Sequence, residues 1–468
     1  MLSSIVAPVS TSSGESMKGS GKSILPPDYV PTGMHLESRD LRLENGMRVL
    51  LTPMSQTNSV GISVFVRAGS RYEKTDGESG LSHFLEHLCF KGTRDRPNPI
   101  DISRELDELG GAFNAVTDRE ITIFYGKMTA DRALQGLTLL IDLLRNSLLE
   151  ADEIERERGV ILEELAAIED SPPELVAVNL EASIWHGQPH GREIAGTVES
   201  VSNMTHQDIK KYYRRQYVPN SIVISVAGAL DVGATENIVR ELCEDWGAGV
   251  PDEYIPHRSS DDVSEDTAFS LSAERRFRLI SRDTEQAHLA IGMPGLSLKD
   301  TKRHSLEIFS IVLGEGMSSR LFTRLREELG LCFDIHSGPS FLSDTGMFGI
   351  YSGVDPHNTS KALEEIVAEI DRTIQSLGEF EIDLAKRIIN SRLILRLEDS
   401  RAVSSYVGLQ AVLGLEMLQP EELLARIESV SVLDIQRTAN ELIDPGKFHL
   451  SLIGPMNGSE LLNQFASF

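Results

Sequence analysis

The sequence repeats itself weakly along its length, and this repeat limits the fold more than any other feature. Three pairs of segments correspond in the same order: 109–128 with 329–354, 168–171 (IEDS) with 397–400 (LEDS), and 199–202 (ESVS) with 428–431 (ESVS). In the first pair, Phe113 corresponds to Phe333. Matches that keep their order indicate a duplication, so the sequence predicts two related units rather than one large domain.

Each unit is predicted to combine a sheet with helices. Apolar residues alternate at 41–51 around Asn45-Gly46, which predicts a hairpin with a type I′ turn, and a further strand follows at 60–66. Helical segments are then expected, before a strand at 221–227, at 79–91, 100–109, 131–148, 151–170 and 205–216. Strands mixed with helices and hairpins indicate an α+β fold, in which a mostly antiparallel sheet packs against helices in each of two homologous domains.

Composition marks the boundaries of these units. Residues 1–35 are rich in Ser, Gly and Pro, which predicts a flexible tail. A polar, acidic stretch at 246–270 contains Pro251 and Pro256 and is expected to be a linker. The sequence therefore predicts a first domain at 36–245 and a second at 271–468.

The charge balance excludes several classes of partner. Lys and Arg number 45 against 71 Asp and Glu, a formal net charge of −26, which disfavours nucleic acids and anionic membrane surfaces. An acidic, solvated surface would have the same composition. No apolar run is long enough for a membrane span, and three cysteines are too few for a disulfide framework. We expect a cytoplasmic protein, with the mitochondrial matrix or another organelle as alternatives.

The residues best suited to chemistry form the motif HFLEH, from His83 to His87. Residues four apart lie on one face of a helix, so His83 and His87 can present two imidazoles to one ion. Glu86 precedes the second histidine and is close enough to act as a general base on water at the metal. Two surface histidines on an amphipathic helix would show the same spacing.

A third ligand has to come from another segment. The helical stretch 155–165 (ERERGVILEEL) offers several carboxylates beside an apolar stripe. Glu157 and Glu164 are two turns apart and share a face, and Glu163 is adjacent. Spacing alone leaves the choice among Glu157, Glu163 and Glu164 open.

These segments together resemble a known family. The motif with LCFKGT at 88–93, GGAFNAVT at 110–117 and ERERGVILEEL at 155–165 is similar to the pitrilysin family of inverted-motif zinc peptidases, and specifically to its mitochondrial-processing-peptidase-like branch. The similarity covers about 38–455. It implies one Zn²⁺ per chain, held by His83, His87 and Glu164, with Glu86 as the base. Glu157 takes the position of the carboxylate that orients a ligand.

The resemblance also implies how a substrate binds. Family substrates add an extended strand to the sheet edge beside the zinc, and here Asn114, Ala115 and Val116 occupy that edge. Phe90 resembles a residue that lines the pocket next to the scissile bond, although core packing would explain it equally well.

The second unit has no metal motif, because its counterpart at 308–317 is aliphatic and contains glycine. It resembles the family's degenerate domain, which contributes an Arg and a Tyr seven residues apart to substrate stabilisation. Arg326 fits the first position, but Phe333 occupies the second and has no hydroxyl. Losing one such donor costs about 2.7–4 kcal/mol of transition-state stabilisation.

The resemblance predicts a zinc-dependent endopeptidase that cleaves unfolded peptides or presequence-like segments. One chain would supply half of a clamshell chamber, so a homodimer, or a heterodimer with a related chain, is expected. An acidic chamber would favour basic peptides. The alternative is a non-catalytic or heterodimeric assembly subunit of a processing peptidase, which Phe333 favours and the intact metal motif opposes.

Overall fold

The computed structural model describes residues 35–258, 276–456 and 458–468. The predicted tail up to residue 34, and the part of the predicted linker from 259 to 270, lie outside the described residues.

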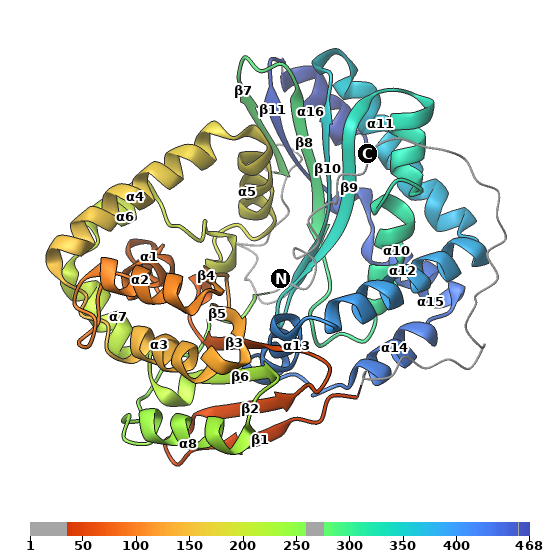
Figure 1. Cartoon of the computed structure of the whole chain (residues 1–468). Helices are drawn as coiled ribbons and strands as arrows, with labels where there is room; N and C mark the ends of the chain where they lie inside the picture. Colours follow the sequence, from red (N-terminus) through yellow and green to blue (C-terminus); the bar gives the residue numbers. More distant parts are fainter. Residues whose placement is uncertain (1–34, 259–275, 457) are drawn as a thin grey trace.

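The first half of the chain builds a six-stranded sheet in the order β1-β2-β6-β3-β5-β4 (Figure 1). Its strands are β1 (Arg39–Arg42), β2 (Arg48–Pro53), β3 (Ser59–Val66), β4 (Ala112–Thr117), β5 (Thr122–Thr129) and β6 (Ile222–Gly228). The β2–β6 pair is parallel and every other pair is antiparallel. Strand β4 lies at the edge of the sheet, beside helix α1 (Leu81–Cys89) (Figure 1).

The second half repeats this topology. Its sheet has the order β7-β11-β8-β10-β9, with strands β7 (Phe277–Ser281), β8 (Ala287–Pro294), β9 (Cys332–Phe341), β10 (Gly346–Val354) and β11 (His449–Gly454). The β7–β11 pair is parallel, as β2–β6 is, and the remaining pairs are antiparallel. Strands β2, β6, β3, β5 and β4 therefore correspond in order to β7, β11, β8, β10 and β9, which confirms the internal repeat and the α+β fold.

The helices follow the same repeat. The first half contains α1 (Leu81–Cys89), α2 (Pro99–Leu109), α3 (Ala133–Arg145), α4 (Ala151–Asp170), α5 (Pro172–Ile184), α6 (Val198–Asn203), α7 (His206–Gln216) and α8 (Val232–Cys243). The second contains α10 (Arg303–Gly314), α11 (Thr359–Ser376), α12 (Glu379–Leu397), α13 (Ser400–Val412), α14 (Pro420–Glu428), α15 (Val432–Leu442) and α16 (Gly458–Ala466). A π-helical segment also spans Phe322–Glu328.

The two halves exchange one helix each. Helix α13 packs on β3, β6 and β2 of the first sheet, where Val403 and Val407 join a core with Phe65 and Val223. Conversely, α5 packs on β8 and β11 of the second sheet (Figure 1). The IEDS and LEDS repeats stand directly before these two helices, at 168–171 and 397–400. Each half therefore buries one face of the other half's sheet.

A buried histidine lies at the α5 contact. His449 of β11 is 4% exposed, and its Nδ1 lies 2.7 Å from Ser183 Oγ of α5. Burial, and secondarily the charge of Arg276, lowers the pKa of His449 to about 4, so the imidazole is neutral at this contact near neutral pH.

One local prediction was wrong. A hairpin joins β1 and β2, but its turn is not type I′, because that turn needs positive φ at both central residues and only Gly46 has it, at +89°. Leu43 and Met47 instead close a longer loop through an N–H to O contact of 3.0 Å. The Asn45 amide donates to the carbonyls of Cys243 and Trp246, so tertiary contacts determine the conformation of this turn.

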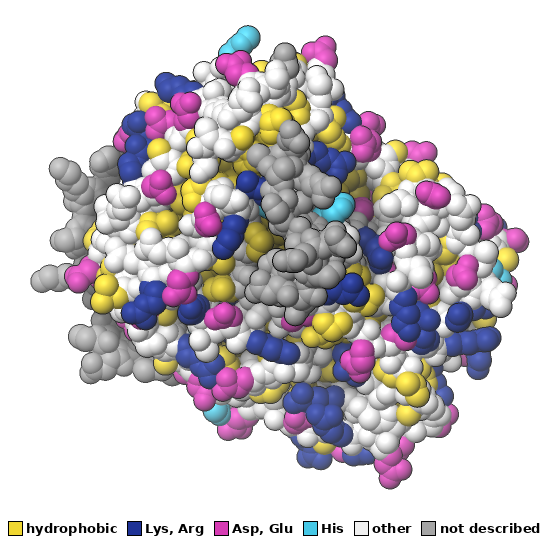
Figure 2. Space-filling model, turned by 180° about the vertical axis from the view of Figure 1, so that it is seen from behind, with side chains coloured by type: hydrophobic (Ala, Val, Ile, Leu, Met, Phe, Trp, Pro, Cys, Tyr) yellow, Lys and Arg dark blue, Asp and Glu magenta, His cyan; other side chains and the backbone are white. Residues whose placement is uncertain are grey.

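On one face of the molecule the surface charge is mixed. The face shown in Figure 2 carries Lys and Arg side chains interspersed with Asp and Glu, although the net charge is −26. Among the described residues, no helix combines the length and apolarity needed to cross a membrane.

Candidate metal centre and active site

The start of helix α1 is held by buried contacts that the sequence does not reveal. Gly80, at φ +92°, precedes the helix, and a Cβ there would lie 2.6 Å from the Ala195 carbonyl oxygen. The carboxylate of Glu73 accepts the N–H groups of Gly80 and Ser82 at 3.1 and 3.0 Å, which satisfies free donors at the helix N-terminus. Burial raises the pKa of Glu73 to about 7. These contacts fix the helix that carries the HFLEH motif.

The two histidines of this helix face a carboxylate on α4. Phe84, Leu85 and Leu88 are buried, so the opposite face of α1 presents His83 and His87, whose ring centres are 4.6 Å apart. Glu164 places its oxygens 3.6 Å from His83 Nε2 and 3.8 Å from His87 Nε2.

These three side chains fit a tetrahedral metal ion. Their ligand atoms all lie within 4.8 Å of one another. Two atoms bound at 2.0–2.1 Å to a tetrahedral ion are about 3.4 Å apart, which is close to the distances between each imidazole and Glu164. Two imidazoles and one carboxylate are a donor set that zinc prefers.

The structure also separates the three carboxylates between which spacing could not choose. Glu164 faces both imidazoles, whereas Glu157 is buried behind His87, with its Oε2 3.2 Å from His87 Nδ1. Glu163 is exposed and belongs to neither contact. With Nδ1–H donating to Glu157, the lone pair of His87 Nε2 is free to bind a metal.

Lys91 extends this arrangement and was missed by the sequence analysis. Its Nζ lies 2.7 Å from Glu157 Oε1, so the ammonium group and His87 hold the two oxygens of one carboxylate. Lys91 stands inside the quoted segment 88–93, but nothing in its spacing from Glu157 signals the contact.

His83 is kept neutral by its surroundings. Burial, with a smaller effect of His87, lowers the pKa of His83 to about 4, so the ring has a lone pair available at neutral pH. Its Nδ1 is buried and has no hydrogen-bond partner among the described residues.

Glu86 lies beside the ligands and is held by a strand residue. The hydroxyl of Thr117, at the end of β4, donates to Glu86 Oε2 at 2.6 Å, which leaves Oε1 without this contact. Burial raises the pKa of Glu86, and the Thr117 hydrogen bond acts in the opposite direction. Thr117 also lies 3.3 Å from the hydroxyl of Thr122, which donates to the Ala68 carbonyl. The motif GGAFNAVT contains Thr117, but its sequence does not show that the hydroxyl reaches the base.

Three of the residues predicted to bind substrate lie on the edge strand β4. Asn114 and Val116 of β4 are exposed and Ala115 is buried, while the Asn114 Oδ1 accepts the Ala115 N–H at 2.8 Å. Phe90 is half-buried and stacks on Phe124 with ring centres 5.9 Å apart. The contact with Phe124 therefore supports the interpretation that Phe90 packs against the core.

Arg326 and Phe333 do not join this cluster. Phe333 is 73% exposed in an irregular part of β9, and the Arg326 guanidinium stacks on its ring at 4.9 Å and on that of Phe322 at 4.6 Å. The described residues show no hydrogen bond, ion pair or ring contact between this pair and the side chains around Glu164.

A helix with two imidazoles and a carboxylate base, facing a carboxylate on a second helix, is the site arrangement of inverted-motif metallopeptidases. The insulinase family profile (peptidase family M16) matches residues 48–198, and the profile of the peptidase M16 inactive domain matches residues 203–389. The chain belongs to peptidase family M16, which confirms the resemblance to the pitrilysin family.

Relatives and solved structures agree with this assignment. An uncharacterized zinc protease of Streptomyces coelicolor is 32% identical over 428 residues, covering 90% of each chain. One of Bacillus subtilis is 30% identical over 414 residues, covering 88% of this chain and 97% of the relative. A protease from Helicobacter pylori, 23% identical with a TM-score of 0.82, shares the fold over 90% of this chain and 100% of its own.

Proposed function

We propose that this chain is a zinc-dependent endopeptidase that hydrolyses extended, unfolded peptides. The observation that carries the proposal is the convergence of His83, His87 and Glu164, whose ligand atoms lie within 4.8 Å of one another beside the carboxylate of Glu86. Relatives named zinc proteases support zinc as the metal.

The residues of the site have different roles in the proposed hydrolysis. A zinc ion held by the three ligands would polarise the scissile carbonyl and make water more acidic. Glu86 takes the proton of the attacking water and gives it to the leaving amine. It does so through Oε1, because the hydroxyl of Thr117 is hydrogen-bonded to Oε2. Glu157 keeps His87 in the tautomer whose Nε2 can bind metal.

The edge strand β4 supports an extended substrate. It is the last strand of its sheet, so one side of its backbone has no partner strand among the described residues. A peptide added there pairs through main-chain groups, which accounts for tolerance of many side-chain sequences. The side chain of Asn114 would give up its contact with the Ala115 N–H when the peptide binds.

A second chain would complete the chamber. Arg326 and Phe333 are accessible and are not connected to the metal cluster of their own chain. We expect Arg326 and Phe333 of each chain to contact substrate in a chamber that is formed with a second copy or a related chain. Light scattering coupled to size exclusion tests the homodimer, and co-purification with related chains tests the heterodimer. A wholly monomeric, fully active protein would contradict this part of the proposal.

Basic, presequence-like peptides are the expected substrates if the charge of −26 extends to the chamber. A cleavage survey of a peptide library would show enrichment of Lys and Arg near the scissile bond. Equal cleavage of acidic and basic peptides would contradict charge selection while leaving the peptidase proposal intact.

The decisive test compares Glu86→Gln with the matched control Glu163→Gln. Loss of a general base lowers kcat by about 10²–10⁴-fold. We expect Glu86→Gln to retain zinc and lose hydrolysis of an unfolded reporter peptide, and Glu163→Gln to match the wild type. A wild type that binds zinc but has no activity removable by Glu86→Gln would favour the alternative, a non-catalytic assembly subunit, for which the missing hydroxyl at Phe333 is the supporting observation.

A further inference from the structure

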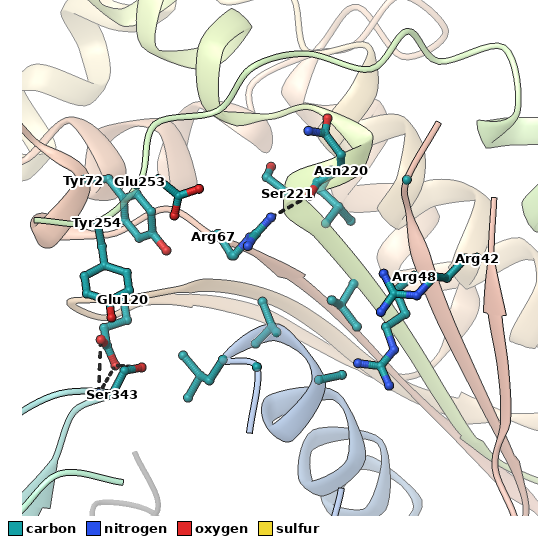
Figure 3. Close-up of a pocket in the computed structure, with 17 residues that line it drawn as sticks. Arg42, Arg48, Arg67, Tyr72, Glu120, Asn220, Ser221, Glu253, Tyr254 and Ser343 are labelled. Atoms are coloured by element: carbon teal, nitrogen blue, oxygen red, sulfur yellow. Dashed lines mark hydrogen bonds between the residues drawn. The ribbon is translucent and has the colours of Figure 1, made fainter. Parts of the chain in front are cut away.

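A cavity of about 240 Å³ lies at the seam between the two halves (Figure 3). Its walls come from the strands of the first sheet, from residues 253–254 after that domain, and from Ser343 and residues 411–414 of the second half. None of its lining residues belongs to the metal cluster.

Two arginines at one end of the cavity repel each other. Arg42 of β1 and Arg48 of β2 are directly opposite in the antiparallel ladder, so their side chains lie on the same face. Like charges directly opposite each other destabilise a strand pair. Asp40 offsets one of these charges, because it accepts from Arg48 Nε and Nη2 at 3.1 and 2.8 Å. Arg42 has no carboxylate within 4.0 Å in the described part of the chain.

Tyr72 and Tyr254 line the opposite end of the cavity, and a third arginine, Arg67, lies between them and the pair Arg42 and Arg48 (Figure 3). Arg67 is half-buried just after β3, and its Nη2 donates to the Asn220 carbonyl at 2.7 Å. Across residues 35–258 and 276–468, excluding 457, no carboxylate approaches it within 4.0 Å. A partly desolvated guanidinium gains most from an anion that it can bind through two parallel N–H groups.

Part of the remaining lining is apolar, beside polar residues such as Asn220, Glu253 and Ser343. Ile222 and Val223 of the first sheet and Val412 at the end of α13 are at most 7% exposed and line the same cavity as these arginines. Glu253 is the one rim carboxylate of the described lining without an ion pair, since Glu120 is held by Arg71 and Ser343. A single opposing carboxylate disfavours ligands that carry several negative charges.

From this arrangement we infer that the cavity binds a small organic acid, with its carboxylate at Arg67 and Arg42 and its apolar body against Ile222, Val223 and Val412. Such a ligand offsets the repulsion between Arg42 and Arg48 and contacts both halves of the chain. Binding therefore stabilises the seam at which α13 covers the first sheet. The inference does not depend on peptidase activity.

Calorimetric titration of the full-length protein tests the inference with three probes. Octanoate combines a carboxylate with an apolar chain, octanamide is its neutral analogue, and inorganic phosphate is an anion without an apolar body. We expect octanoate to bind at least about tenfold more tightly than either of the others, as loss of one charge-assisted contact predicts. It should also raise the melting temperature.

Matched variants locate the binding site. Arg67→Gln and Arg42→Gln should lower octanoate affinity to that of octanamide, whereas Arg104→Gln, an exposed arginine of α2 outside the cavity, should not change it. Because Arg42 makes no ion pair in the described structure, its variant is expected to fold even if Arg67→Gln does not. Glu164→Ala should leave octanoate binding intact, which excludes ligation at the metal centre.

Three results would overturn the inference. These are no binding of octanoate, binding that neither Arg42→Gln nor Arg67→Gln weakens, and phosphate or octanamide binding as tightly as octanoate. Loss of binding only in Glu164→Ala would assign the effect to the metal centre instead.

Discussion

Thr117 links the strand that is expected to bind substrate to the proposed catalytic base, so its removal should impair catalysis without removing the metal. In Thr117→Val the side chain keeps its shape but loses the hydroxyl that donates to Glu86 Oε2 at 2.6 Å. Glu86 then loses the contact that directs Oε1 toward water. Thr117 makes no hydrogen bond to His83, His87 or Glu164, so zinc binding should persist.

The magnitude follows from the kind of hydrogen bond. A hydrogen bond to a charged group is worth about 1.5–3 kcal/mol. If most of this contribution is lost in the transition state, kcat falls by about 10- to 150-fold, since each 1.36 kcal/mol is tenfold in rate. The fold should tolerate the change, because Thr122 keeps its own acceptor, the Ala68 carbonyl, at 3.1 Å. KM should change little, because the β4 backbone is unaltered.

The assay measures kcat and KM on a fluorescence-quenched unfolded peptide, together with zinc content and melting temperature. Thr117→Ser is the matched control, because it keeps the hydroxyl and should recover most of the activity. Wild-type kcat in Thr117→Val, or equal losses in the Val and Ser variants, would refute the role of the hydroxyl. Inactive wild-type protein would instead refute the proposed function.

Three further predictions concern the fold. Gly80→Ala should lower the melting temperature more than Gly110→Ala, because both glycines have positive φ but only at Gly80 would a Cβ meet backbone atoms; equal losses would contradict this reasoning. His449→Asn should make the fold less sensitive to acid. The pKa of the native imidazole is about 4, against 6.5 in the unfolded chain, so the folded protein loses stability as the pH falls from about 6.5 toward 4. The free energy of unfolding lost in this way is at most about 3 kcal/mol. Melting curves from pH 7.5 to 5 would show a smaller shift in the variant. Gly408→Ala should destabilise by about 1–3 kcal/mol through overpacking, since its Cβ would lie 2.2 Å from the Phe65 ring, and denaturant unfolding would measure the change.

The sequence predicted the framework of this molecule well because the framework depends on local patterns. Strands β3 and β6 and helices α1, α2, α4 and α7 lie where alternation or helical periodicity placed them. The duplicated segments also identified equivalent positions in the two sheets, such as Phe113 in β4 and Phe333 in β9. The spacing of His83 and His87 sufficed to place both imidazoles on one face of α1.

Contacts between distant segments could not be predicted in this way. Helix α5 was not expected, and its apolar residues indicate only that it is buried, not that it covers the sheet of the other half. Glu73 and Thr117 act on α1 from other elements, and their sequences resemble ordinary turn and strand residues. The choice of Glu164 over Glu163 depends on which way α4 turns its faces toward α1.

The duplicated scaffold also explains why, in the described part of the chain, only the first half brings two histidines and a carboxylate together. Helix α10 follows β8 as α1 follows β3, so the two helices occupy equivalent positions. However, α10 packs against β9 and is also contacted by α12 and α15, and its residues are buried almost throughout, including Ile308, Phe309 and Leu313. A metal site there would place ionised ligands where water cannot reach. The polar face of α1 instead lies toward the edge strand β4, so the same position in the fold provides a core helix in one half and the helix of the proposed metal site in the other.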